Sequence, residues 1–398
     1  MQGPAYKSNP SGWVPLFRVS FFFLALAIAG LWSVGCQSDE TAPHPAPHSA
    51  VRSSPEESDI ETLRVAAETG DTRSLTLLAQ AYALGEGVEQ NSGRAFELYL
   101  QAAKQGFAPA QYHLAGLYLS GQGVEPNNEK AVEWLEQAAQ QGHLHSQYRL
   151  GGLYSRGMGV EKNPQRAVEL LAHSASGGLA QAQMELGLIF VHGRGVSPDP
   201  EEGYRWLKRA ADQDFAPALM RIGLLYQRGD GLPRSVTEAA RWMRQAAELG
   251  YAPAQDRLGQ MYLQGQGVEI DKQKGVSWVR KAADQALASA QSNMGLIYIQ
   301  GQGVERDLEQ AVRWYRLAAD QGLATAQNRM ATMYEHGRGV QQDLVLALFW
   351  RLLAAGQGDE AAKQQCKALY GKMSVEQIEK ARDLITLRAE EQARQGQN

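Results

Sequence analysis

Pairs of glycines are the first residues in this chain whose type and spacing could support chemistry. Gly121 and Gly123 lie in the stretch SGQGVEPNN, which resembles the start of a dinucleotide-binding loop, where backbone amides hold a pyrophosphate. Such a loop needs a third glycine, and residues 124–128 contain none. The G-x-G also recurs every 36 residues, with first glycines at Gly85, Gly121, Gly157, Gly193, Gly229, Gly265, Gly301 and Gly337. A nucleotide site would occur once, so the regular spacing indicates a structural turn in a repeat protein.

Other catalytic and metal-binding patterns are missing from the sequence. It contains no H-E-x-x-H, C-x-x-C, G-x-S-x-G or S-x-x-K. His143 and His145 have no acidic or thiol residue nearby in the sequence, so we expect them to be solvated rather than to bind a metal. Cys36 and Cys366 cannot make a disulfide framework, and we expect Cys366 to be a small buried hydrophobic residue. We therefore expect no catalytic, cofactor or metal site.

A column of basic residues is the best candidate for a functional site. Two positions of the first helix, eight residues and one residue before the first glycine of each turn, lie on nearly the same helical face. We call the basic residues at these two positions, together with the adjacent Tyr112 and Tyr148, the basic stripe. It comprises His113, Arg149, Arg221, Arg257 and Arg329 at the first position and Arg156, His192, Arg228 and His336 at the second. Stacked repeats would align it for an acidic or carboxylate-bearing partner. The alternative is a solvated face with local ion pairs.

Two helices in each repeat must position this stripe. Small and apolar residues at spacings of four predict a first helix, ended by a glycine that can adopt the left-handed conformation. Six residues after that glycine a side chain able to cap a second helix recurs: Asn91, Asn127, Asn163, Asp199, Ser235, Asp271, Asp307 and Asp343. The second helix carries a bulky residue that we expect, with the tyrosines of the first helix, to form the core: Leu98, Trp134, Leu170, Trp206, Trp242, Trp278, Trp314 and Trp350.

The combined pattern is A-x-x-x-L-G-x-x-Y-x-x-G-x-G-V followed by A-x-x-W-x-x-x-A-A-x-x-x-G. It resembles the Sel1-like repeat, a relative of the tetratricopeptide repeat. The resemblance implies an all-α, right-handed α/α superhelical solenoid of about eight helix-turn-helix repeats of 36 residues. It also implies a groove, lined by the first helices, that binds an extended segment of another protein. Some relatives have been described as penicillin-binding or β-lactamase-like, but those are rich in paired cysteines, which this chain lacks.

The N-terminus suggests export. The apolar run Val19–Gly35 follows two basic residues and ends at Cys36, which resembles a bacterial lipoprotein signal whose cysteine is lipidated. Ser33 departs from the leucine usual at that position, and Gln37 after the cysteine implies an outer-membrane destination. An uncleaved inner-membrane anchor facing the periplasm and an ordinary cleaved signal remain alternatives.

The chain thus divides into four predicted segments: a signal peptide or membrane anchor (1–35), a Pro- and Ser-rich tether (36–58), the repeats (59–373) and a C-terminal capping helix with its tail (374–398). Ile60–Gly70 matches only a second helix, a ninth first helix covers about 359–370, and Ser374–Gln377 forms a capping box. The net charge of −4 argues against a nucleic-acid partner. We expect a lipid-anchored protein-interaction scaffold or adaptor of the cell envelope. The alternative is an envelope enzyme or a carbohydrate- or peptidoglycan-binding protein.

Overall fold

The computed structural model describes residues 57–395, in which all regular secondary structure is helical. Each repeat contributes a first helix, called the A helix, and a second, called the B helix. The A helices are α3 (Thr72–Leu84), α5 (Ala108–Ser120), α7 (Leu144–Arg156), α9 (Ala180–His192), α11 (Ala216–Arg228), α13 (Ala252–Gln264), α15 (Ala288–Gln300) and α17 (Ala324–His336). The B helices are α4 (Ser92–Lys104), α6 (Asn128–Gln140), α8 (Pro164–Ser176), α10 (Pro200–Ala211), α12 (Val236–Glu248), α14 (Lys272–Asp284), α16 (Leu308–Asp320) and α18 (Leu344–Gly356). The predicted all-α solenoid of 36-residue helix pairs is confirmed.

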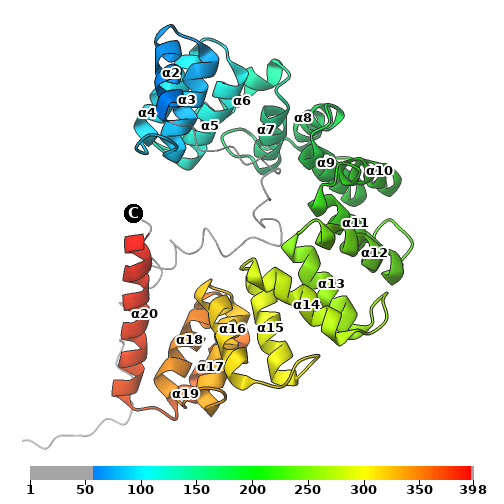
Figure 1. The fold of residues 1–398 in the computed structure, drawn as a ribbon, viewed down its shortest axis with the longest axis vertical. Coiled ribbons are helices and arrows are strands. Elements are labelled where there is room, and N and C mark those ends of the chain that lie inside the picture. Colours follow the sequence, from blue (N-terminus) through cyan, green and yellow to red (C-terminus); the bar gives the residue numbers. More distant parts are fainter. Residues whose placement is uncertain (1–56, 396–398) are drawn as a thin grey trace, which may run out of the picture. The chain divides into compact units, whose positions relative to one another are not determined.

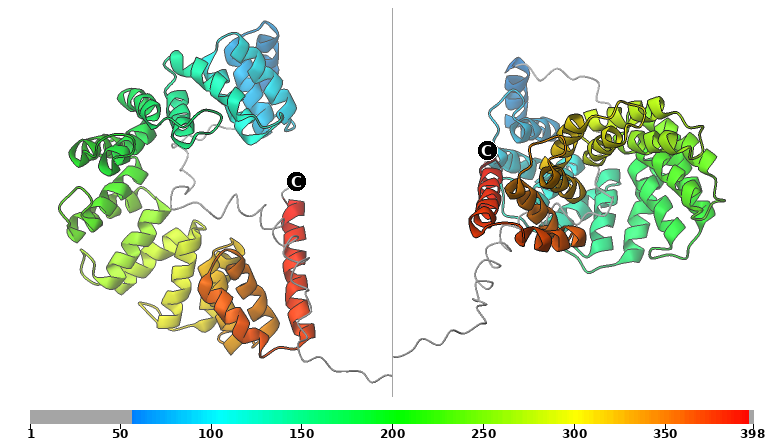
Figure 2. Two further views of the ribbon diagram at one scale, coloured as in Figure 1. Left: turned by 180° about the vertical axis from the view of Figure 1, so that it is seen from behind. Right: turned by 90° about the horizontal axis from the view of Figure 1, so that it is seen from below.

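The described chain forms two compact units, residues 57–281 and 282–395, with the boundary inside α14. Within each unit, every helix up to α19 lies beside its neighbour in the sequence (Figure 1, Figure 2). None of the helices described is both long and apolar enough to cross a membrane. The predicted leader, Cys36 and most of the tether lie outside the described residues.

The predicted turns and caps are confirmed. The A helices of the eight repeats end at glycines with φ between 62° and 82°, the left-handed region. At the start of α4 the side-chain oxygen of Asn91 accepts a hydrogen bond from the backbone N–H of Arg94 (2.9 Å), and the other seven capping residues accept equivalent bonds.

The second glycine of the turn has an additional role, because it packs on the repeat before it. A Cβ on Gly267 would overlap the carbonyl oxygen of Val236, in the first turn of α12. The glycine that closes a B helix is different: a Cβ on Gly250 would meet no atom within 4 Å. At that closing position Asp214 and Ala286 adopt positive φ values of 56° and 61°, so residues other than glycine are accepted there.

Alanine substitutions should separate these two roles of glycine. Gly250→Ala should lower the free energy of unfolding by about 1–2 kcal/mol, the cost of left-handed backbone alone. Gly267→Ala, which has a similar positive φ, should cost at least about twice as much because the backbone of α12 must also move. Urea unfolding followed by circular dichroism measures both losses. Equal losses would contradict the steric role of Gly267.

In most repeats the B-helix residue that is buried in the core is not the one that we predicted. Five of the six tryptophans in the predicted core column are only half-buried, and Trp350 alone is buried, at 3% exposure. Most tyrosines of the A helices are also half-buried. The buried residue directly follows the tryptophan position and is at most 3% exposed: Tyr99, Leu135, Leu171, Leu207, Met243, Val279 and Tyr315.

The residue after the tryptophan position is buried because it faces the small residue of the A helix. A Cβ on Gly295 would lie 2.6 Å from ring carbons of Tyr315, and one on Gly223 would lie 3.1 Å from the Cε of Met243. Each large B-helix side chain therefore fills the space left by a missing side chain on the A helix. The tryptophans lie beside this seam, where Arg209 stacks on Trp206 at 4.3 Å and shields its ring.

A buried glutamine near the start of most A helices links its repeat to the one before, a feature that the sequence analysis missed. The Nε2 of Gln111 donates to the carbonyl of Ala103 in the preceding repeat (3.2 Å), and its Oε1 accepts from Gln141 at the end of its own repeat (2.9 Å). The side-chain bond recurs in the pairs Gln183 and Gln213, Gln291 and Gln321, and Gln327 and Gln357. The glutamines satisfy a carbonyl near the end of most B helices and fix the register between repeats.

Both predicted ends of the array are helical. Helix α2 (Glu57–Glu68) forms the half-repeat at the start, and α19 (Glu360–Tyr370) precedes α20 (Val375–Gln395). Ser374 and Gln377 exchange hydrogen bonds of 3.0 and 3.2 Å, so the predicted capping box is confirmed. In the second unit α20 lies against α18 (Figure 1). Its Arg388 stacks on Trp350 at 5.2 Å, which is why this tryptophan alone is buried.

Candidate protein-binding surface

The arginines of the basic stripe lie on A helices and reach toward the A helix of the preceding repeat. Arg257 on α13 donates to the side chain of Gln227 on α11 (2.8 Å). Arg329 on α17 donates to the hydroxyl of Ser292 on α15 (3.1 Å). Arg149 on α7 lies over the ring of Tyr112 on α5, 5.7 Å from its centre. Because these partners are neutral, the arginines are ordered by them but keep their charge.

Ion pairing differs between the basic stripe and part of the B-helix surface. Among residues 57–395, none of the stripe arginines Arg149, Arg156, Arg221, Arg228, Arg257 and Arg329 forms an ion pair. The exposed B-helix arginines Arg94, Arg166, Arg205 and Arg241 each pair with a glutamate three or four residues away. Two other exposed B-helix arginines, Arg209 and Arg244, contact the neutral side chains of Trp206 and Tyr262. Local ion pairs therefore neutralise several B-helix arginines, whereas the stripe arginines keep their charge available.

Nine of the eleven residues of the basic stripe belong to the first unit, and Arg329 and His336 belong to the second. The stripe is not uniform. Arg149, Arg221 and Arg257 are half-buried, whereas Arg156 and Arg228 are exposed at the ends of α7 and α11. Tyr148 is half-buried beside Arg149 and packs against the neighbouring hydrophobic core.

The densest part of the stripe surrounds one tyrosine, and we call Tyr112, His113, His143, His145 and Arg149 the Tyr112 cluster. The ring centre of Tyr112 lies 5.4 Å from His113, 5.4 Å from His143 and 6.0 Å from His145. The prediction that both of the last two histidines are simply solvated is wrong for His143, which is half-buried. The part of the chain that the structure describes contains no group of three or more potential ligands placed to hold a metal ion.

The surroundings lower the pKa of two of these histidines. Packing of neighbouring groups around its ring lowers the pKa of His113 most, by desolvation, although part of its side chain remains exposed, and the nearby His143, Arg149 and His145 add to the effect. Burial and then His145 lower the pKa of His143. Both imidazoles are therefore neutral near pH 7. The Nδ1 of His143 lies 2.8 Å from the hydroxyl of Ser146, which orients the ring.

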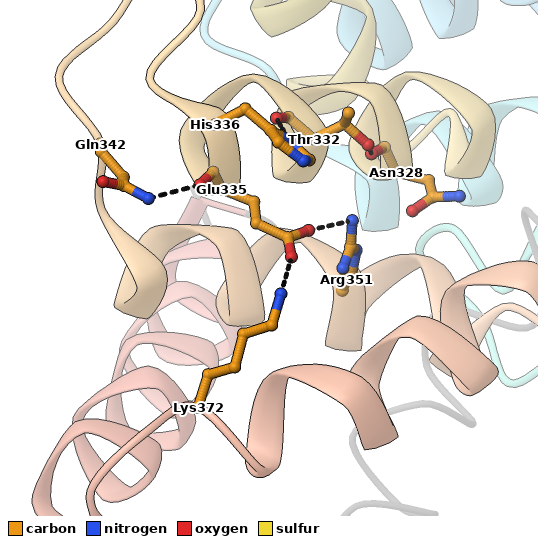
Figure 3. A network of polar contacts seen from close by, with 7 residues as sticks. All are labelled: Asn328, Thr332, Glu335, His336, Gln342, Arg351 and Lys372. Atoms are coloured by element: carbon orange, nitrogen blue, oxygen red, sulfur yellow. Dashed lines mark hydrogen bonds and ion pairs between the residues drawn. The ribbon is translucent and has the colours of Figure 1, made fainter.

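Unlike polar groups also converge in the eighth repeat (Figure 3). Arg351 occupies the fully buried B-helix column and is 2% exposed. Its guanidinium binds the carboxylate of Glu335 (2.8 Å), which also accepts from Lys372 (3.0 Å). The Nε of Arg351 and the Oδ1 of Asn328 are buried with no hydrogen-bond partner in the described structure. This network joins α17, α18 and the end of α19.

Two groups near this network are poor candidates for catalysis. Burial acts to raise the pKa of Glu335, but Lys372 and Arg351 outweigh it, so the pKa of the carboxyl lies below its ordinary value. Burial raises the pKa of the Cys366 thiol to about 11, against the opposing charge of Arg351. A thiol with this pKa is protonated near neutral pH and is a weak nucleophile. The prediction that Cys366 is a small buried residue is confirmed.

Substitutions should show that Glu335 compensates a buried charge. Glu335→Leu leaves Arg351 unpaired and should lower the free energy of unfolding by about 3–5 kcal/mol. Lys372→Met should cost less than about 1 kcal/mol, because the lysine is exposed. The double variant Glu335→Leu/Arg351→Leu recreates the apolar pair Leu119 and Leu135 of the second repeat and should unfold near the wild-type midpoint. Urea unfolding of the four proteins measures this.

The pH dependence provides the control for these variants. A lowered pKa means that the ionised carboxylate of Glu335 stabilises the folded state fully above its ordinary pKa. This stabilisation is lost as the pH falls through the lowered value. The difference between wild type and Glu335→Leu should therefore shrink between pH 6 and pH 3. A difference that stays constant would contradict the ionic role.

The helix pairs and the unpaired arginines of the basic stripe define a helical repeat protein with a candidate protein-binding surface. Eight consecutive segments match the Sel1 repeat, and the chain belongs to this family. They are residues 72–107, 108–143, 144–179, 180–215, 216–251, 252–287, 288–323 and 324–359. Repeat proteins of this family generally act as scaffolds for protein interactions.

Two solved structures share the fold. A protective antigen of uropathogenic Escherichia coli with an SLR fold is 31% identical, with a TM-score of 0.60 over 84% of this chain and 72% of that one. A Sel1 repeat protein from Oxalobacter formigenes is 32% identical, with a TM-score of 0.57 over 82% and 98%. An exopolysaccharide production negative regulator of Rhizobium meliloti (strain 1021) is 43% identical over 61 residues. That match covers 15% of this chain and only 23% of the regulator.

Proposed function

We propose that this protein is a scaffold that binds an acidic segment of another protein through the A helices of its first unit. The observation that carries the proposal is that the stripe arginines are ordered by neutral groups and form no ion pair, while four exposed B-helix arginines, Arg94, Arg166, Arg205 and Arg241, are neutralised by glutamates of their own helices. Unpaired cations in a chain of net charge −4 have no evident benefit for folding. They remain available to pair with negative charges on a partner protein.

Binding, rather than catalysis, is the activity that the described residues support best. The carboxylate of Glu335 is already engaged by Arg351 and Lys372, and the Cys366 thiol is protonated near neutral pH. The Ser146 hydroxyl beside His143 belongs to a fully buried side chain, so it is not accessible to a substrate as a nucleophile. We therefore favour a scaffold over an envelope enzyme.

We further propose that the scaffold is exported and anchored by a lipid on Cys36 to the outer membrane, facing the periplasm. The support is the apolar run Val19–Gly35 that ends at this cysteine, followed by Gln37. The match to exopolysaccharide regulators covers only part of their length. A role in exopolysaccharide production is therefore one of several that an envelope scaffold could have.

Neutralising the stripe should abolish partner capture. The triple variant Arg149→Gln/Arg221→Gln/Arg257→Gln should lose at least about tenfold in recovery of a stoichiometric protein partner from envelope extracts. The matched control Arg94→Gln/Arg166→Gln/Arg241→Gln removes the same number of charges from B helices and should capture the partner normally. Quantitative mass spectrometry of the captured proteins measures both. Equal recovery by the two variants would rule out the stripe as the binding surface.

Lipidation can be tested separately from binding. Wild-type protein in cells treated with globomycin should accumulate as a larger precursor, and Cys36→Ser should abolish that shift and release the protein from the outer-membrane fraction. Immunoblotting of fractionated cells measures both. A Cys36→Ser protein that still fractionates with the outer membrane would rule out the lipid anchor.

A further inference from the structure

We propose that the Tyr112 cluster binds a carboxylate of the partner and takes up protons when it does so. This inference rests on the proposed function, because it specifies how one part of the A-helix surface recognises an acidic segment. It adds a property that the arginines alone cannot provide, namely affinity that rises as the pH falls.

The cluster is a departure from the repeat pattern that packing does not explain. The position of His143 is Phe107, Leu179, Phe215, Tyr251, Leu287 and Leu323 in other repeats, where an apolar side chain precedes the A helix. The position of Tyr112 is Met or a small polar residue in most repeats. Three of the six histidines in the described chain meet at this one place. Departures from local pattern that bring unlike groups together are expected at functional sites.

The groups that face His113 come from three elements. Tyr99 of α4 stacks on its ring at 5.2 Å and 20°, Tyr112 precedes it on α5, and His143, His145 and Arg149 approach from the start of α7. Burial raises the pKa of Tyr99 to about 12, so this phenol stays neutral. Every charged group that shifts the pKa of His113 is therefore a cation or a potential cation.

This arrangement favours a carboxylate as the ligand. In the free protein, burial and neighbouring cations oppose protonation of His113 and His143. A bound carboxylate would supply the missing opposite charge and raise both pKa values toward or above their ordinary value. Each protonated imidazole then has two N–H donors, and Arg149 adds a guanidinium that suits a carboxylate. A metal cation would instead be repelled by Arg149.

The sign of the pH effect follows from linkage. A ligand that raises the pKa of a group binds with uptake of protons, and its affinity increases as the pH falls through the interval between the free and bound pKa values. Because the free pKa values of His113 and His143 lie below that of an ordinary histidine, the affinity should rise as the pH falls from neutral into the weakly acidic range. Glutamate side chains remain mostly ionised there, so the ligand keeps its charge.

The test uses the full-length protein and an acetylated hexaglutamate peptide, with hexaglutamine as the uncharged control ligand. Isothermal titration calorimetry at pH 5.5, 6.5 and 8.0, in two buffers of different ionisation enthalpy, gives the affinity and the number of protons taken up. We expect affinity for hexaglutamate to increase about tenfold from pH 8.0 to 5.5, with uptake of about one proton. Hexaglutamine should not bind.

Matched variants assign the effect to the cluster. His113→Asn/His143→Asn/His145→Asn should abolish proton uptake and the pH dependence, whereas the control His173→Asn, on α8 and outside the basic stripe, should retain both. Circular dichroism checks that each variant keeps its helices. NMR titration of the wild-type imidazoles provides a measurement without mutation, and the pKa values of His113 and His143 should rise when the peptide is added.

Several outcomes would overturn the inference. They are absence of binding at all three pH values, equal binding of hexaglutamine, affinity independent of pH, or a pH dependence that the cluster variant keeps. None of these bears on the capture of a protein partner through the stripe arginines, which is measured with the histidines intact. Loss of capture in the arginine variant together with pH-independent peptide binding would leave the scaffold standing and remove only the carboxylate site.

Discussion

The nesting of one large B-helix residue against one missing or minimal side chain on the A helix is the contact on which this molecule depends. Tyr315 against Gly295 and Met243 against Gly223 show it in the two units. The close approach leaves no room for a polar residue without a partner, and Arg351 is accepted in the column because Glu335 neutralises it. The glycine turns serve the same contact, since the second glycine lets each turn lie against the preceding B helix.

Because this contact recurs in every repeat, the buried positions carry little information that differs from one repeat to the next. Specificity has to reside in side chains near the surface, and there the two helices of a repeat behave differently. Several B-helix arginines pair with glutamates of their own helix, while Arg149, Arg257 and Arg329 on the A helices lie against tyrosine, glutamine and serine from the repeat before. A surface whose charges are oriented but not neutralised is suited to a partner of opposite charge.

The candidate site was only partly predictable. The column spacing placed Arg149, Arg221 and Arg257 on the same face of successive A helices, with Glu185 between the first two, because a 36-residue period maps onto stacked helices. The same spacing could not place His143 and His145 beside Tyr112, since they flank the start of the next A helix, 31 and 33 residues away in the sequence. A usable signal was present: His143 stands where most repeats have an apolar residue. The buried glutamine bonds could likewise have been suspected from the recurrence of Gln at one position.

The sequence by itself determined the helices, turns, caps and number of repeats, because glycine conformation, capping side chains and apolar spacing act over a few residues and are written in every copy. Only the tertiary structure decided which large column is buried. The tryptophan and the residue after it point in directions about 100° apart around the helix, and the sequence allows either to face the core. The second position is buried because it lies against the small residues of the A helix. Trp350 illustrates the point, for it is buried where Arg388 of α20 lies over its ring.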